Sequence, residues 1–278
     1  SGDKETGTRC VGNGVLLTAA IGVVFMAAGL CFTDGILNLF GVTEACYPFA
    51  WDYMRVILLG IPFYIFTSGM NAVIRADGSP RFSMIATVLG AVLNLVLDPF
   101  AIFVLHMGVK GAAAATVIGQ AASCALTALY FKKPKSFTFG RKSFRLDGRI
   151  AKRLCQLGIS SFITQIAIVA IISAANNMIG VAGPKSQYGA DIPLSVVGIV
   201  MKVFGIVIAF SVGIAVGGQP ITGYNYGAGN YQRVFATYRR VVLANLAVGA
   251  AATLLFELCP QAIISRFGNE SGLYREYA

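Results

Sequence analysis

The stretch "GAVLNLVLDPFAIF", residues Gly90 to Phe103, is apolar enough to cross a membrane and yet contains Asn94 and Asp98. A carboxylate at the centre of a membrane helix costs about 2.5–3.5 kcal/mol on insertion scales, so it needs a partner or a function. Asn94 and Asp98 are four residues apart and therefore lie on one face of a helix. The stretch predicts a membrane-spanning helix that carries a polar site.

The rest of the chain has the composition of a membrane protein. Of its 278 residues, 56% are hydrophobic and only 12% are charged, whereas soluble domains have about 25% charged residues. Runs long enough to cross a hydrocarbon core of about 30 Å lie near 11–33, 52–74, 82–106, 109–131, 153–177, 193–216 and 235–258. In lipid, backbone N–H and C=O groups can form hydrogen bonds only within the protein, which leaves helices or a closed β-barrel. The links between the runs are too short for a barrel, so the runs predict helices. The predicted fold is an all-α polytopic membrane protein with seven transmembrane helices.

The sequence has no pattern typical of an enzyme or of a metal or cofactor site. Its six cysteines occur singly, and His106 is its single histidine, so neither the spacing of a metal site nor a disulfide framework is present. It also lacks a P-loop, a GxSxG and an HExxH motif. We therefore expect no enzymatic activity, no metal site and no cofactor. The expected bound ion is H⁺ or Na⁺, in the role of a coupling ion.

The net charge of +10 is explained by the placement of the basic residues. The longest polar stretch, "FKKPKSFTFGRKSFRLDGRIAKR" from Phe131 to Arg153, is dense in Lys and Arg. The positive-inside rule places it in the cytoplasm, as a linker at 132–152 of a multi-pass protein of the cell inner membrane. Nucleic-acid binding is not indicated, because the charges are spread over separate loops without aromatic stacking residues. The predicted domains are 1–131 with four spans, the linker 132–152, and 153–278 with three spans and the start of a fourth.

A weak internal repeat supports two equivalent halves. At an offset of 227 residues, Val15-Leu16 aligns with Val242-Leu243 and Phe40-Gly41 with Phe267-Gly268. The first and seventh spans would then be equivalent, which predicts parallel six-span repeats and a full protein of twelve spans. We therefore expect this chain to be a piece of a longer protein. Two unrelated helices of similar composition are the alternative.

The next span supplies a neighbour for Asp98. The link between the third and fourth spans centres on Met107-Gly108, and Thr116 follows Met107 by as many residues as Asp98 precedes it. Antiparallel helices would hold both side chains at one depth. Asn94, Asp98 and Thr116 then predict an oxygen-lined site for a proton or a hard cation such as Na⁺. A structural Asp held by its neighbours, or one at the lipid headgroups, is the open alternative.

Two further side chains are candidates for a cavity. Lys202 lies in the middle of the sixth span, where its charge costs about as much as that of Asp98. A role in a substrate cavity and a structural ion pair both stay open for it. Met70, on the second span, is a candidate for lining a cavity, although methionines on membrane helices more often serve packing.

In its motifs the sequence resembles the multidrug and toxic compound extrusion (MATE) transporters, and in detail their MepA-like branch. The resemblance covers essentially the whole chain and rests on four motifs that are specific together and in this order. They are "NAVIRADGSPRFSM" (Asn71–Met84), "NLVLDPFAIF" (Asn94–Phe103), "GVKGAAAATVIGQ" (Gly108–Gln120) and "GGQPITGYNYGAGN" (Gly217–Asn230).

The resemblance implies a twelve-helix fold with two six-helix lobes, in which the present spans are the third to the ninth helices. It implies a cation site whose matching residues are Asn94, Asp98 and Thr116, and a further Asp on a first helix that this chain does not contain. Some branches carry an acidic residue on the seventh helix, where this chain has Gln165 as the nearest polar residue, and Gln165 is a further candidate for a cavity or an ion pair. Coupling through the second lobe is therefore in doubt.

The function that the resemblance implies is secondary active multidrug export by antiport with H⁺ or Na⁺. The expected partners are small organic, often cationic, substrates and the lipid bilayer, and we expect a monomer. Two alternatives are kept open. A flippase for lipid-linked precursors belongs to the same superfamily but needs a strongly cationic cavity, and a seven-helix membrane protein without transport activity matches the span count alone.

Overall fold

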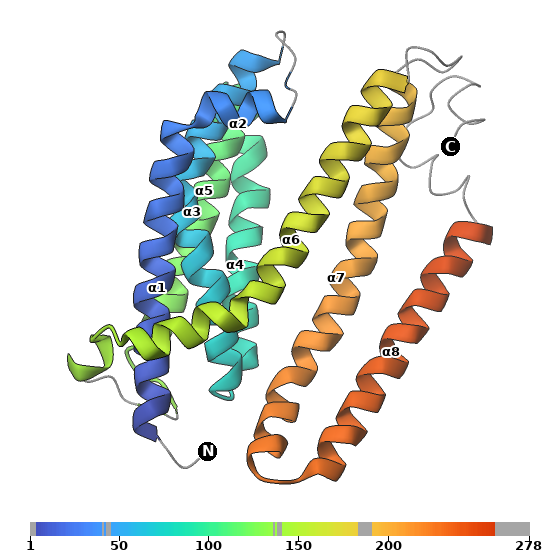
Figure 1. Ribbon diagram of the computed structural model, residues 1–278. Coiled ribbons are helices and arrows are strands. Elements are labelled where there is room, and N and C mark those ends of the chain that lie inside the picture. The colour runs from blue at the N-terminus through green and yellow to red at the C-terminus, as the bar shows by residue number, and fades with distance from the viewer. Residues whose placement is uncertain are drawn as a thin grey trace. The chain divides into compact units, whose positions relative to one another are not determined.

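The computed structural model of the chain describes residues 4–40, 42, 46–135, 137, 141–182 and 191–258. Within these residues the regular structure is entirely helical (Figure 1). The elements are α1 (Lys4–Cys31), α2 (Thr33–Leu39), α3 (Tyr47–Ala76), α4 (Pro80–Pro99), the π-helix η1 (Phe100–Val104), α5 (Gly108–Tyr130), the 3-10 helix η2 (Arg141–Phe144), α6 (Gly148–Ala182), α7 (Asp191–Gly227) and α8 (Tyr231–Leu258). Seven helices in the described part are long and apolar enough to cross a membrane, which confirms the predicted spans and fold class.

The chain divides into two compact units, residues 1–162 and 163–278, with the division inside α6. The first four spans lie in unit 1, and α6 already begins at Gly148, inside the predicted linker. The predicted lobes, 1–131 and 153–278, stay a prediction.

Unit 1 is a bundle in which α3 packs against both α1 and α5, and α5 packs in turn against α4. Figure 1 shows these helices side by side, with the short α2 at one end of the bundle. Glycines bring the backbones close, as is usual between membrane helices. A Cβ at Gly22 of α1 would lie 2.7 Å from Cα of Pro62 on α3. Small residues therefore set how closely α1 and α3 pack.

The chain changes its hydrogen-bond pattern directly after Asp98. Pro99 ends α4, and the next residues form the π-helix η1, in which the Leu105 amide donates to the Phe100 carbonyl at 3.1 Å. Proline has no N–H to donate to the carbonyl four residues earlier, so the α-helical hydrogen bonding is interrupted at Pro99, directly before the π-helix begins. The reversal that follows uses left-handed backbone at His106 (φ 52°) and Gly108 (φ 56°). The site residues of α4 and α5 are thus joined by a short, sharply turned link.

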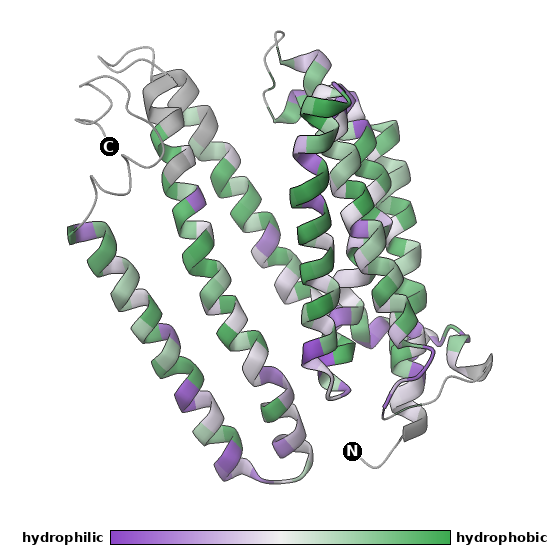
Figure 2. Ribbon diagram, turned by 180° about the vertical axis from the view of Figure 1, so that it is seen from behind, coloured by the Kyte–Doolittle hydropathy of each residue, from purple (hydrophilic) through white to green (hydrophobic). Residues whose placement is uncertain are grey.

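In unit 2, α7 and α8 pack against each other as an antiparallel pair. The turn between them passes through Gly229, whose φ of 75° is accessible to glycine without strain. The second copy of the predicted repeat begins in α8, and its residues after Leu258 lie outside the described part. Figure 2 shows that apolar residues predominate along these helices, as expected for helices that lie in lipid.

Candidate functional site

Asn94 is the centre of a hydrogen-bonded cluster between α4 and α5. Its Nδ2 donates to Oδ1 of Asp98 at 3.0 Å and to Oγ1 of Thr116 at 3.1 Å. The Thr116 hydroxyl donates in turn to the carbonyl of Ala112 at 3.0 Å. All three side chains are half-buried. The structure therefore brings together the three residues of the predicted cation site.

The register of the cluster differs from the one expected. The sequence predicted Asp98 at the depth of Thr116, whereas Asn94 bonds to Thr116 and Asp98 lies one turn further along α4. The π-helix η1 advances less per residue than an α-helix, and the reversal begins before Met107. The amide of Asn94 therefore links Asp98 to Thr116.

Two glycines allow the helices to approach at the cluster. Gly90 lies one turn before Asn94, and Gly119 lies nearly one turn after Thr116. A Cβ at Gly119 would lie 2.5 Å from the Gly90 carbonyl oxygen, and a Cβ at Gly90 would lie 2.8 Å from the Gly119 carbonyl oxygen. No other residue fits either position without separating α4 from α5. This contact holds Asn94 within reach of Thr116.

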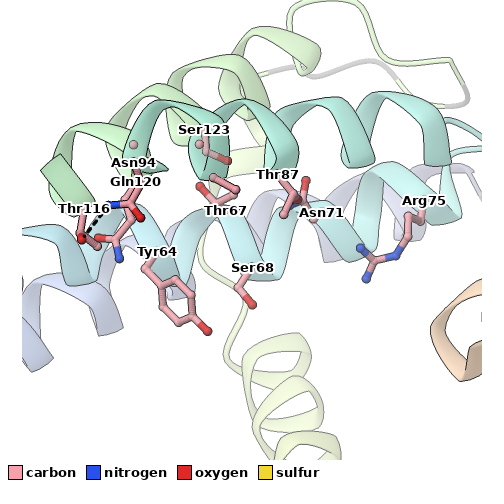
Figure 3. Close-up of a pocket in the computed structure, with 13 residues that line it drawn as sticks. Tyr64, Thr67, Ser68, Asn71, Arg75, Thr87, Asn94, Thr116, Gln120 and Ser123 are labelled. Carbon is pink, nitrogen blue, oxygen red and sulfur yellow. Dashed lines mark hydrogen bonds between the residues drawn. The ribbon is translucent and has the colours of Figure 1, made fainter. Parts of the chain in front are cut away.

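A polar cavity of about 440 Å³ adjoins the cluster in unit 1 (Figure 3). Its lining comes from α3, α4 and α5 and consists of Tyr64, Thr67, Ser68, Asn71, Arg75, Thr87, Gly90, Ala91, Asn94, Thr116, Gly119, Gln120 and Ser123. Asn94 and Thr116 belong to this lining, while Asp98 lies behind Asn94. A volume of this size is typical of sites for drug-sized molecules.

The cavity wall contains polar atoms whose hydrogen-bonding capacity is not used within the described residues. Asn71 donates to Thr87 at 3.1 Å, but its Oδ1 has no donor although the side chain is only 6% exposed. Oε1 of Gln120 is likewise buried without a donor. Both oxygens are shielded from the open space of the cavity, and a Cβ at Gly60 of α3 would lie 2.1 Å from Oε1 of Gln120. Buried polar atoms are normally paired, so these two acceptors are exceptions within the cavity wall.

Sequence reasoning missed most of this lining. Thr67, Asn71 and Arg75 follow each other at intervals of four residues and so share one face of α3, a signal that was available in the sequence. Arg75 is the charged member, and its guanidinium donates to Oγ of Ser83 at 3.3 Å. In the sequence, Arg75 stands out only as part of the motif from Asn71 to Met84.

The other predicted candidates are not among the residues that line this cavity. Met70 is 2% exposed, and it faces Gly14 of α1 as part of the core of unit 1 rather than of the cavity wall. Gln165 and Lys202 are both exposed in unit 2. Within the described residues Lys202 has no carboxylate partner, so its role in a cavity or an ion pair stays a prediction. A search of the same residues found no group of His, Cys, Asp and Glu that could hold a metal ion.

Among the described residues, seven apolar helices of membrane-spanning length, a hydrogen-bonded carboxylate and a neighbouring cavity in one bundle define a polytopic α-helical membrane protein. The chain belongs to the MatE family, whose model matches residues 1–100 and 167–276. The family inferred from the sequence motifs is thereby confirmed.

Known proteins similar to the chain come from several organisms. The multidrug export protein MepA of Staphylococcus haemolyticus is 24% identical over 90% of this chain and 54% of its own length. The probable multidrug resistance protein YoeA of Bacillus subtilis is 26% identical over 96% of this chain and 58% of its own length. A solved structure of a MOP superfamily transporter from Pyrococcus furiosus superposes with a TM-score of 0.85, at 23% identity, over 98% of this chain and 59% of that one. The chain thus has the MATE-type fold and spans a little over half the length of the curated relatives it matches.

Proposed function

We propose that this chain forms part of a secondary active multidrug exporter in which an inward flow of H⁺ or Na⁺ drives the efflux of small organic, often cationic, molecules. The cluster of Asn94, Asp98 and Thr116 is the observation that supports the proposal. It places a half-buried carboxylate inside an apolar bundle, next to a cavity large enough for a drug-sized molecule. The relatives named as multidrug export and multidrug resistance proteins favour the same function.

The mechanism requires that the coupling ion and the substrate prefer different arrangements of the helices around Asp98. A ligand shifts a conformational equilibrium only through its different affinities for the two states. Asn94 links the two events, because it lines the cavity and also donates to the Asp98 carboxylate. A substrate that bonds to Asn94 changes the environment of Asp98 directly. In this proposal the protein lies in the cell inner membrane with residues 132–152 in the cytoplasm.

A flippase for anionic lipid-linked precursors is the second candidate, and Arg75 in the cavity wall is the observation that favours it. A precursor with phosphate groups needs several cations. Arg75 is the only charged side chain among the lining residues described for this cavity, and the others are amides, hydroxyls and small residues. Export of drug-like molecules therefore fits the lining better.

The experiment uses the full-length protein in proteoliposomes with an imposed H⁺ or Na⁺ gradient. Asp98→Asn should abolish ion-driven efflux at equal protein content, because it removes the titratable, charged group of the cluster and leaves its shape. The matched control is Asp52→Asn, which changes the carboxylate that pairs with Lys110 at 3.1 Å outside the cavity. Efflux at the wild-type rate in Asp98→Asn would show that Asp98 is structural. Efflux without any dependence on either gradient would refute the coupling itself.

A further inference from the structure

The end of the linker is fixed to α1 by one buried side chain. Asn13 is 0% exposed, and its Nδ2 donates to the carbonyls of Arg9 at 2.9 Å and of Arg145 at 3.3 Å. Its Oδ1 accepts from the amide of Asp147 at 2.9 Å. A single amide therefore holds the backbones of Arg9 and Arg145 beside each other, although these residues belong to different segments.

Both arginines line one cavity. Its volume is about 420 Å³, and Leu146, Asp147 and Gly148 complete the lining. The side chains of Arg9 and Arg145 are exposed. Asp147 carries the single negative charge of this lining, and its Oδ1 accepts from the amide of Arg149 in the first turn of α6. The lining thus carries two guanidinium groups and one carboxylate, and this carboxylate already caps a helix.

The cavity lies where two membrane-spanning helices begin. The apolar span of α1 starts at Thr6 and that of α6 starts at Gly148, so Arg9 and Arg145 are within a turn of both starts. The ends of membrane spans lie at the level of the lipid headgroups. Arginine binds phosphate oxygens with two parallel N–H donors, which makes it well suited to this depth.

We propose that this cavity, the Asn13 cavity, binds the phosphate group of one anionic phospholipid. The positive-inside rule explains why basic residues lie on this side of the membrane, but it does not require two of them to be held together by a buried amide. The arrangement by Asn13 is what distinguishes a site from a diffuse basic surface. The binding is independent of the export activity proposed above, since no residue of the Asn94 cluster or its cavity takes part.

The test measures lipids retained by the full-length protein in nanodiscs of mixed phosphatidylglycerol and phosphatidylcholine, by native mass spectrometry. Arg9→Gln and Arg145→Gln should each lower the affinity for phosphatidylglycerol about five-fold, and the double variant about 30-fold. The control is Arg149→Gln, which removes an equal charge four residues from Arg145 but outside the cavity lining, and it should change the affinity less than about two-fold.

A second variant separates an arranged site from general attraction. Asn13→Ala keeps every charge but releases the backbone of Arg145 from α1, so phosphatidylglycerol retention should fall several-fold. The two arginine variants leave the bonds of Asn13 intact, because these bonds are made to backbone carbonyls. They therefore test the site even where Asn13→Ala fails to fold.

Three outcomes would overturn the proposal. Unchanged retention in the double arginine variant would show that the cavity binds no lipid phosphate. An equal loss in Arg149→Gln would show a diffuse surface in place of a site. Displacement of the lipid by millimolar inorganic phosphate would assign the cavity to free phosphate, whereas retention in its presence supports the phospholipid.

Discussion

A single methyl group at Gly119 tests how the Asn94 cluster is held. A Cβ at Gly119 would lie 2.5 Å from the Gly90 carbonyl oxygen, and ordinary contact begins at 3.4 Å. The obstacle is a backbone atom of a helix, which cannot rotate away. Gly119→Ala must therefore separate α5 from α4 by about 0.9 Å at this level, because closer contact is strongly repulsive.

That displacement is sufficient to break the bond between the two helices. Nδ2 of Asn94 and Oγ1 of Thr116 are 3.1 Å apart, and the added separation places them about 4 Å apart, beyond hydrogen-bond range. Hydrogen bonds between membrane helices contribute about 0.6 kcal/mol on average and about 1.7 kcal/mol at most. We therefore expect the cation concentration for half-maximal efflux to shift between about three-fold and about 18-fold.

The assay follows drug efflux from proteoliposomes against the concentration of the coupling cation, with the amount of folded full-length protein matched. Thr116→Val removes the same hydrogen bond without moving the helices and should give a similar shift. Because both changes delete the same hydrogen bond, the double variant should shift the half-maximal cation concentration no further than the more affected single variant does. Gly7→Ala is the control, since nothing lies within 4 Å of a Cβ there. Wild-type cation dependence in Gly119→Ala, or fully additive shifts, would refute the reasoning.

Three other changes have defined outcomes. Gly12→Ala should speed tryptic cleavage of the linker, because a Cβ there would overlap the Ser143 carbonyl. Gly14→Ala is the control and should not change the cleavage rate, because its Cβ would meet only a side-chain atom at 3.7 Å. Equal cleavage rates in the two variants would show that the linker does not pack against α1. Asn71→Leu should raise the substrate concentration for half-maximal efflux about five-fold, which corresponds to the loss of one hydrogen bond of about 1 kcal/mol. The dependence of efflux on the cation concentration should not change. An unchanged dependence on the substrate concentration would show that Asn71 does not contact the substrate. Lys133→Cys in a cysteine-free protein should react with an impermeant maleimide only from the cytoplasmic side, and labelling from outside would invert the proposed orientation.

The seven spans were predictable from the sequence because lipid imposes a minimum length and requires every backbone group to bond within its own helix. The pairing of Asn94 with Asp98 was predictable for a similar reason, since residues four apart share a helix face. Both inferences depend on local sequence alone. They needed no knowledge of which helix packs against which.

The properties that depend on packing were predicted less well. Thr116 was expected opposite Asp98, whereas its hydrogen bond across the two helices is to Asn94, one turn earlier on α4, and a π-helix follows Pro99. Arg75 resembles any basic residue near the end of a span, and only the approach of α4 to α3 makes it part of a cavity wall. A hydrogen-bond pattern that changes within one helix has no clear signature in hydropathy.

The bonds of Asn13 have a consequence for biosynthesis. The amide and its partner carbonyl on Arg145 are 132 residues apart, and ribosomes add about 5–20 residues per second. During synthesis α1 therefore leaves the ribosome about 7–26 s before the segment that satisfies its buried amide exists. Three further membrane spans, Tyr47–Ala76, Pro80–Val104 and Gly108–Tyr130, are made in that interval. The end of α1 that carries Asn13 can adopt its final form only when the chain returns to it, so this helix is completed after helices that are made later.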